Sequence, residues 1–101
     1  GVPIYPGAVF SPELTAGMSL GDESHIYVYF SNDPPEQVTD FYRKRLGKEP
    51  AFVGEEFGYI FPIKGSLPFP EEGLTVQPYV YEAFGLGSYK TTIAIQKQVG
   101  D

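Results

Sequence analysis

Residues 31–47 carry the strongest local structural signal in this chain, a helix with a recognisable start and end. The stretch reads SNDPPEQVTDFYRKRLG. Asp33 is a favourable N-cap, Pro34 suits the first helical position, and Gly47 is typical of a left-handed helix stop. Between these ends, apolar side chains recur at helical spacing and form one stripe, made of Val38, Phe41, Tyr42 and Leu46. The pattern predicts a helix over 34–46 that buries this stripe.

Short strands separated by turns are expected to occupy most of the remaining chain. The clearest strand, residues 24–31, alternates its side chains between two faces. One face holds Ile26, Val28 and Phe30, and the other holds His25, Tyr27 and Tyr29. Further strands are predicted near Ala8, over 74–83 and over 89–98, and residues 49–63 are expected to form a short strand, a Gly-Glu-Glu turn and a second strand. Pro78 indicates that the 74–83 segment is an edge strand or contains a bulge.

The predicted elements define a fold class. One helix among about five short strands, in the order β-β-α-β-β-β, indicates an α+β fold. We expect an antiparallel sheet with the helix packed on one face. A length of 101 residues predicts a single domain over 1–101. Within it, Pro3 and Pro6 favour an extended N-terminal arm over 1–8, in which Ile4 and Tyr5 are the side chains available to dock on the domain.

The composition argues against several classes of partner and site. The chain has 7 basic and 13 acidic residues and a net charge of −6, so it repels phosphates and nucleic acid is not an expected partner. It contains no Cys, which removes disulfides, thiolate zinc sites and cysteine nucleophiles. No apolar run approaches the roughly 18 residues that span a bilayer, so no transmembrane segment is expected.

No group of residues in the sequence indicates catalysis. The only histidine, His25, lies early in a strand on the face away from the expected core, where a surface position is the simplest explanation. The acidic pairs lack the spacing of a calcium loop. FGLGSYKT, residues 84–91, lacks the Gly-Lys pair and the following helix of a phosphate loop, and is better explained as a hairpin turn with Phe84 and Leu86 exposed. We therefore expect no catalytic residue, no metal and no cofactor.

The feature that most resembles a binding surface is a set of alternating tyrosines. Tyr27 and Tyr29 share one face of a strand, and Tyr79 and Tyr81 share one face of another. If the helix covers the opposite side of the sheet, the four rings form an open platform for a sugar, a peptide, a lipid head group or another protein. The alternatives are cross-strand pairs that only stabilise a solvated face, or a homodimer that buries it. Arg45, near the middle of the helical stripe, either extends its stem over apolar surface, pairs with a carboxylate near the sheet edge, or binds a ligand.

Part of the chain resembles a known pattern. VPIYPGA (2–8), YVYFSND (27–33) and PPEQVTDFYRKRLG (34–47) are similar to segments of uncharacterised bacterial exported proteins and lipoproteins. These proteins share a Pro-x-Tyr-Pro-Gly segment and a Pro-Glu-x-Val-x-x-Phe-Tyr helix. The resemblance covers roughly the first half of the chain and implies an extracytoplasmic location, periplasmic or lipid-anchored. The family has no established activity, so the resemblance assigns no catalytic residue.

Three functional hypotheses remain open. The first is a non-enzymatic binding or interaction domain of a bacterial envelope or secreted protein, with a protein, peptide or small molecule as its unknown partner. The second is a small enzyme that uses scattered carboxylates with Arg45 or His25. The third is a structural accessory domain of a longer precursor. Because the chain begins with Gly1 rather than Met, we expect Gly1 to be either a remnant of recombinant expression or the product of processing, so that any targeting segment is already removed, and a cytoplasmic location is the alternative.

Overall fold

The computed structural model describes residues 4–12, 24–52, 54, 58–64, 72–85 and 87–98. These residues form one α-helix and six strands. The elements in chain order are β1 (Val9–Phe10), β2 (Ser24–Ser31), α2 (Pro35–Leu46), β3 (Ala51–Phe52), β4 (Tyr59–Lys64), β5 (Glu72–Pro78), the 3-10 turn η1 (Glu82–Phe84) and β6 (Thr91–Gln98). No helix in these ranges is both long enough and apolar enough to cross a membrane.

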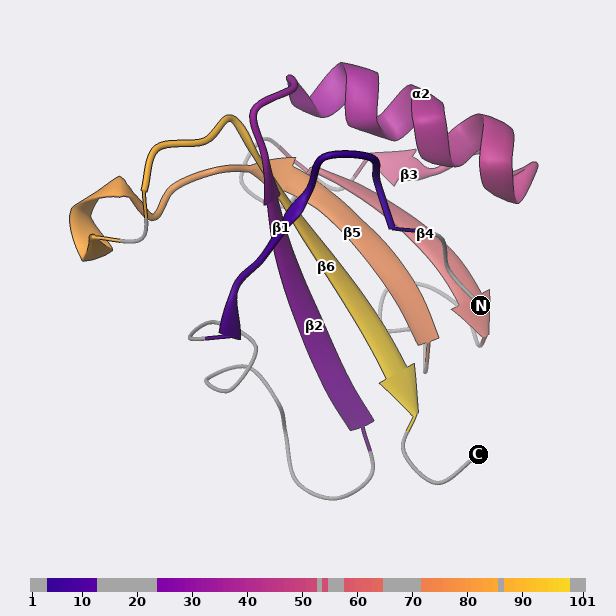
Figure 1. Ribbon diagram of the computed structural model, residues 1–101. Helices are drawn as coiled ribbons and strands as arrows, with labels where there is room; N and C mark the ends of the chain where they lie inside the picture. The colour runs from indigo at the N-terminus through magenta and orange to yellow at the C-terminus, as the bar shows by residue number, and fades with distance from the viewer. Residues whose placement is uncertain are drawn as a thin grey trace.

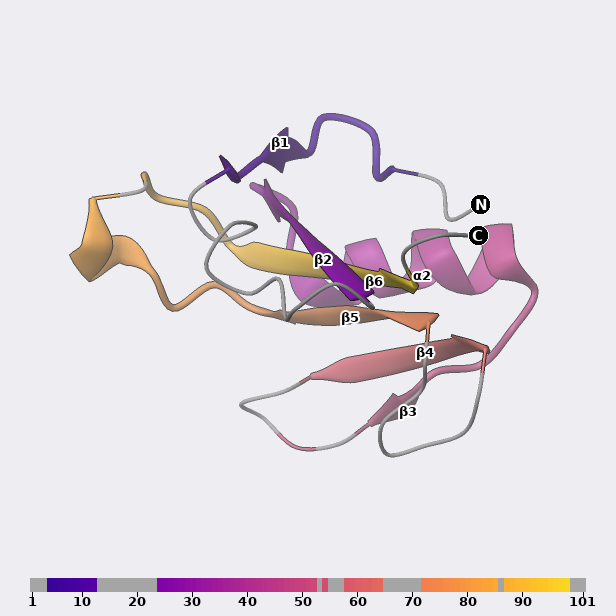
Figure 2. The same cartoon turned by 90° about the horizontal axis from the view of Figure 1, so that it is seen from below.

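All six strands belong to one antiparallel sheet, and α2 lies across one of its faces (Figure 1). The strand order is β1-β2-β6-β5-β4-β3, and every neighbouring pair is antiparallel. Strand β6 therefore lies between β2 and β5, and the short β1 and β3 form the two edges (Figure 2). The α+β fold with an antiparallel sheet and one helix is confirmed. The sheet has six strands rather than about five, and the short strand and the second strand expected within 49–63 are β3 and β4, which pair with each other.

The predicted helix is present, although it begins differently from the prediction. Gly47 ends it in the left-handed conformation, with φ 64°, and donates its N–H to the carbonyl of Arg43. At the other end, Pro34 is the N-cap residue and no side chain caps the helix. The expectation that Asp33 is the N-cap was wrong. Its carboxylate instead accepts a hydrogen bond from the Tyr5 hydroxyl, at 2.6 Å, so a contact from the N-terminal arm has replaced the local cap.

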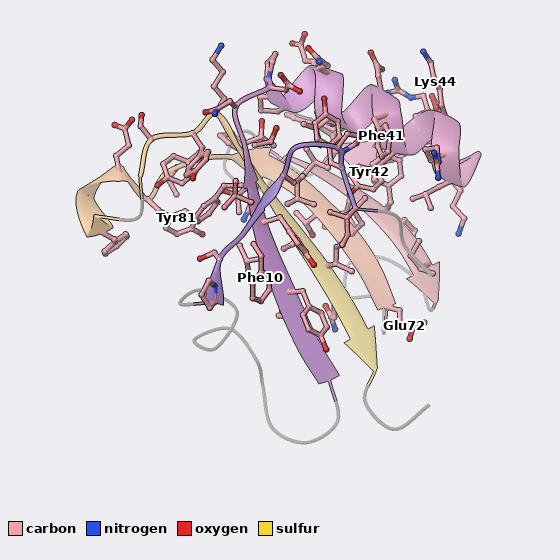
Figure 3. All side chains as sticks on the ribbon, viewed as in Figure 1. Phe10, Phe41, Tyr42, Lys44, Glu72 and Tyr81 are labelled. Carbon is pink, nitrogen blue, oxygen red and sulfur yellow. The ribbon has the colours of Figure 1, made fainter. Side chains whose placement is uncertain are left out.

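The apolar stripe of α2 forms the helical half of the core. Val38 and Tyr42 are fully buried, while Phe41 and Leu46 are half-buried and pack against the core at its margin. Figure 3 shows Tyr42 beneath the helix and Lys44 pointing away from the sheet. The sheet and the arm supply the other buried side chains of this cluster: Tyr5, Phe61, Leu74, Val76, Ile93 and Ile95.

The helix covers the tyrosine face of β2, which is the opposite of the prediction. Tyr27 pairs with Ile95 and Tyr29 with Ile93, and residues paired directly across an antiparallel ladder share a face. Both tyrosines accordingly pack against the helix-side core. The other face is also buried, because Val28 is 0% and Phe30 3% exposed. Both faces of β2 are covered, so the alternation of its side chains includes no polar face that would identify the solvent-exposed side.

Strand β5 ends earlier than predicted, at Pro78. The prolyl residue pairs with Thr91 of β6, whereas the pairing of β5 with β4 stops at Val76. Strand β5 is thus an interior strand rather than an edge strand. Pro78 is tolerated at its C-terminal end because β4 no longer pairs with β5 there, so no backbone hydrogen bond to β4 requires an N–H at that position. As a result, Tyr79 and Tyr81 lie beyond the strand rather than within it.

The N-terminal arm docks chiefly through Tyr5, and Ala8 also packs against the core. Tyr5 is 6% exposed and its ring meets the ring of Phe41 edge-on at 5.1 Å, while Ile4 remains 54% exposed. Pro6 and Gly7 follow in a turn closed by the N–H of Ala8 on the Tyr5 carbonyl, and Gly7 has φ 82°. Proline followed by a positive-φ glycine is typical of a type II turn. The turn redirects the chain into β1, leaving the Tyr5 ring under the arm.

Candidate functional site

Residues 79–85 and 87–90 form a projection that leaves the end of the sheet between β5 and β6, far from the C-terminal end of α2 (Figure 1). The base is closed by two backbone hydrogen bonds, from the N–H of Tyr79 to Lys90 and from the N–H of Lys90 to Ser31. Two side-chain bonds cross the projection itself. Tyr79 donates its hydroxyl to the Gly87 carbonyl at 2.6 Å, and Ser88 donates to Oε1 of Glu82 at 2.7 Å. This aromatic projection is therefore a braced segment.

An aromatic cluster extends from the base of the projection to its exposed end. Its members are Phe30, Tyr79, Tyr81, Phe84 and Tyr89. The buried ring of Phe30 lies at the base, 4.9 Å from the Tyr79 ring centroid and 5.1 Å from that of Tyr89. Tyr79 and Tyr81 then meet edge-on at 5.7 Å. Aromatic pairs at such distances and angles are favourable, so Phe30 fixes the positions of the tyrosines above it.

The outer side of the projection is apolar and exposed. Val80 is 69% exposed and Phe84 is 70% exposed, the highest values among the large apolar side chains that the structure describes. Val9, 47% exposed on β1, lies directly opposite Phe30 in the β1–β2 register and so shares a face of the sheet with the base of the aromatic cluster. Exposed large apolar side chains on an ordered segment are a feature of interaction sites.

The predicted four-tyrosine platform does not form. Tyr27 and Tyr29 pack on the helix side of the sheet, where Tyr29 contacts the Phe10 ring at 5.4 Å. Tyr79 and Tyr81 gather instead on Phe30, which belongs to the other face of β2. Figure 3 shows Tyr81 at the projecting end, well separated from Tyr42 under the helix. The structure thus keeps two of the four tyrosines together and separates them from the other two.

Two residues of the cluster were missed as site candidates. Phe84 was identified only as an exposed turn residue, and Tyr89 was placed at the start of the last strand, although β6 begins at Thr91. Leu86, the other apolar residue of that turn, lies outside the described residues. The available signal was the density of aromatic residues on both sides of a Gly-rich turn.

Arg45 and His25 do not join the aromatic cluster. The guanidinium of Arg45, in the last turn of α2, lies over the Phe41 ring at 5.6 Å from its centroid, and the residue is exposed. This contact is a cation–π interaction. The backbone of His25 pairs with Lys97 between β2 and β6, and its side chain lies outside the described part of the structure. Arg45 therefore stabilises the margin of the core, and any ligand role for it stays a prediction.

The electrostatics of the projection suit uncharged contacts. Partial desolvation is the largest cause that raises the pKa of the Tyr79 phenol, and the nearby Glu82 and Tyr89 raise it further. The phenol therefore stays protonated and acts as a hydrogen-bond donor at neutral pH. Within the described ranges, no three His, Asp or Glu side chains gather closely enough to hold a metal ion. The projection can therefore contribute apolar surface and a few phenol hydroxyls to a contact.

Comparison with protein-family models, with curated proteins and with solved structures finds no match to this chain.

Proposed function

We propose that this chain is a non-enzymatic binding domain that contacts a protein partner through the aromatic projection. The observation that carries the proposal is the exposure of Val80 and Phe84, at 69% and 70%, on a segment braced by a buried aromatic base. Tyrosine-rich, pre-ordered surfaces supply large contact area at a low cost in side-chain entropy. Such residues also dominate measured binding energies at protein interfaces.

The shape of the surface favours a protein over a small molecule. Small ligands bind in concave sites that bury most of their surface. The aromatic projection instead extends outward from the sheet (Figure 1), so a partner has to supply the groove. The exposed Val80 and Phe84 side chains are suited to contact with such a groove, with the Tyr81 and Tyr89 hydroxyls as donors at the rim.

The proposal includes a location outside the cytoplasm of a bacterium. Its support is the resemblance of 2–8 and 27–47 to exported proteins. In the structure, two parts of that pattern contact each other, because Tyr5 of the Pro-x-Tyr-Pro-Gly segment packs on Phe41 of the Phe-Tyr pair. The motif thus corresponds to a packing unit, which explains why its residues would occur together without any catalytic role.

Site-specific photocrosslinking tests the proposal. A benzophenone amino acid is placed at Phe84 in one variant and at Phe52 in a matched control, since Phe52 is also an exposed phenylalanine, at 59%, but lies on β3 at the far edge of the sheet. We expect crosslinking in cells of the source organism to one defined protein from position 84 and not from position 52.

The crosslinked protein is then purified and its affinity measured against serine variants. Phe84→Ser should weaken binding at least about tenfold, as expected for a central interface residue, whereas Phe52→Ser should leave the Kd unchanged. Equal crosslinking from both positions, or a Kd insensitive to Phe84→Ser, would refute the proposed surface. Both substitutions are at exposed sites, so neither result depends on a loss of folding.

A further inference from the structure

The N-terminal arm and β1 attach to the part of β2 that supports the aromatic projection. Val9 of β1 pairs with Phe30, whose buried ring lies at the base of the aromatic cluster. Just beyond Phe30 along the chain, the carboxylate of Asp33 accepts the hydroxyl of Tyr5 at 2.6 Å. The chain from Tyr5 to Val9 is therefore attached at, and just beyond, the residue on which the cluster rests.

Asp33 links this attachment to the base of the projection. Its carboxylate accepts the hydroxyl of Tyr5, and its backbone carbonyl accepts a 2.6 Å hydrogen bond from Oγ1 of Thr91, which is fully buried. Thr91 is the first residue of β6 and directly follows Lys90, whose carbonyl accepts the N–H of Tyr79. Hydrogen bonds and one peptide bond thus connect the docked arm to the two chain segments that close the base of the projection.

The arm has fewer buried contacts than the elements to which it is attached. Among its described residues, Tyr5 alone is buried, Ala8 is half-buried and Ile4 is exposed. The strand that follows, β1, has two residues and lies at an edge of the sheet. Segments with few buried contacts open locally at a lower free energy than the whole fold. The arm is therefore expected to undock while the helix and the central strands stay folded.

We propose that docking of the N-terminal arm keeps the aromatic projection ordered. With the arm docked, Tyr5 holds Asp33, and Asp33 in turn holds Thr91 at the start of β6. The hydrogen bond between Tyr79 and Lys90 at the base of the projection then stays closed. Undocking removes the first of these bonds, so the base opens more often and the aromatic side chains above it become less ordered.

Arm docking in this way regulates the surface proposed to bind a partner. A surface that is ordered before binding has a smaller entropic cost of association, so the docked form binds more tightly. Coupling of this kind is reciprocal, and a bound partner should also strengthen the docking of the arm. This regulatory role rests on the proposed function, whereas the coupling of the arm to the projection is a property of the free protein and is tested without a partner.

Amide hydrogen exchange of the free protein, followed by NMR at neutral pH, tests the coupling in a double-mutant cycle. Tyr5→Phe removes the bond to the carboxylate and keeps the ring, so exchange at Ala8, whose N–H bonds within the arm, should become about five- to thirtyfold faster. Exchange at Tyr79 and Lys90 should accelerate at least about threefold, within the range of coupling energies in one hydrogen-bond network. Thr91→Val removes the next bond of the route, and in that background Tyr5→Phe should have no further effect on Tyr79 and Lys90.

Gly47→Ala is the matched control for a general loss of stability. It strains the backbone at the C-terminal end of α2, where nothing lies within 4 Å of the added Cβ, and it touches neither the arm nor the projection. Exchange at Ile93, in the interior of β6, reports global unfolding in every variant. Relative to Ile93, exchange at Tyr79 and Lys90 should stay unchanged in Gly47→Ala and rise in Tyr5→Phe.

Three results would overturn the coupling. The first is equal acceleration at Tyr79 by the control and by Tyr5→Phe, which would show only a general loss of stability. The second is a purely additive effect of Tyr5→Phe and Thr91→Val, which would exclude the route through these residues. The third is unchanged exchange at Ala8 in Tyr5→Phe, which would show that the hydroxyl does not hold the arm. None of these results bears on photocrosslinking from Phe84, so failure of the coupling is distinguishable from failure of the proposed surface.

Discussion

The hydroxyl of Tyr5 donates a 2.6 Å hydrogen bond to Oδ2 of Asp33, a residue 28 positions further along the chain. Gln37 in the first turn of α2 donates a second bond, of 3.2 Å, to the same hydroxyl. One side chain of the N-terminal arm is thereby tied to the start of the helix. Because the Tyr5 ring also packs on Phe41, the arm contributes to the core rather than lying loosely over it.

Tyr5→Phe should lower the free energy of unfolding by about 1–2 kcal/mol, because it removes a partly buried hydrogen bond to a charged group and keeps the ring. Tyr5→Ala should cost about 3 kcal/mol or more, since the ring is lost as well. Urea denaturation at pH 7 measures both values. Ile4→Ala, at the exposed neighbour, should change stability by less than about 0.5 kcal/mol. A Tyr5→Phe protein as stable as the parent would show that the bond does not anchor the arm.

Alkaline pH should destabilise the fold through Tyr42. Burial raises the pKa of Tyr42 from the ordinary 10.0 to about 12, against a smaller opposing contribution from its hydrogen bond to the Tyr5 backbone. The unfolded chain therefore loses this proton first, and stability that is complete below pH 10 falls as the pH rises toward 12. The difference between a pKa of 10.0 in the unfolded chain and about 12 in the folded protein corresponds to a loss of about 3 kcal/mol in the free energy of unfolding over that range.

Urea titrations between pH 9 and pH 11.5 would measure this loss, with phenolate absorbance reporting ionisation. Tyr42→Phe should flatten the part of the curve above pH 10 that this residue causes. Burial also raises the pKa of Tyr5, so a shallower decline should remain in the variant. Identical slopes in the two proteins would contradict burial of the Tyr42 phenol.

Gly58→Ala should be among the most damaging small substitutions in the chain. Gly58 has φ +67°, and a Cβ there would lie 2.1 Å from the carbonyl oxygen of Val76, which is backbone of the neighbouring strand β5. Gly47 is a matched control, because its φ is +64° and nothing lies within 4 Å of the same Cβ. Gly47→Ala should cost about 1–2 kcal/mol from backbone conformation alone.

Gly58→Ala carries the same conformational cost and the clash in addition, so we expect a loss of at least about 3 kcal/mol or failure to fold. The difference between the two variants in urea denaturation isolates the clash. If both lose the same amount, the backbone of β5 does not approach Gly58 closely enough to exclude a methyl group.

Phe30→Ala should disorder the aromatic cluster as well as destabilise the protein. Phe30 is 3% exposed and contacts the rings of Tyr79, Tyr81 and Tyr89, so its removal leaves a cavity beneath them. We expect a loss of about 3–5 kcal/mol, with a reduced tyrosine signal in the near-ultraviolet circular dichroism spectrum. Phe84→Ala, at the exposed tip, should leave stability within about 0.5 kcal/mol. A tyrosine signal that Phe30→Ala leaves unchanged would mean that Phe30 does not order the cluster.

The sequence predicted most of the secondary structure because its signals are local. Gly47 stops the helix through its own backbone freedom, and strand 24–31 has the predicted limits. The helix start was misassigned because the Asp33 carboxylate is engaged by Tyr5, a contact between residues far apart in the chain. Likewise, Pro78 was expected to mark an edge strand, but it lies at the end of an interior one where only β6 is alongside.

The candidate site was harder to predict because it depends on which face of β2 meets the helix. Both of its faces carry apolar side chains and both are buried near its C-terminal end, so a period of two does not distinguish them. The register with β6 determines which face of β2 meets the helix, because it places Tyr29 opposite Ile93. Only after that choice, and after the early end of β5, do Tyr79 and Tyr81 fall on Phe30.

The central position of β6 has a consequence for how the protein is made. Lys90 and strand β6 are the only described link of backbone hydrogen bonds between the β1–β2 pair and the β3–β4–β5 group. While the chain emerges from the ribosome, neither group can complete its ladder until residues 90–98 appear. Nascent chains that stall before position 90 should therefore present two unsatisfied strand edges to chaperones and proteases, and folding should be slow compared with a helical protein of similar size.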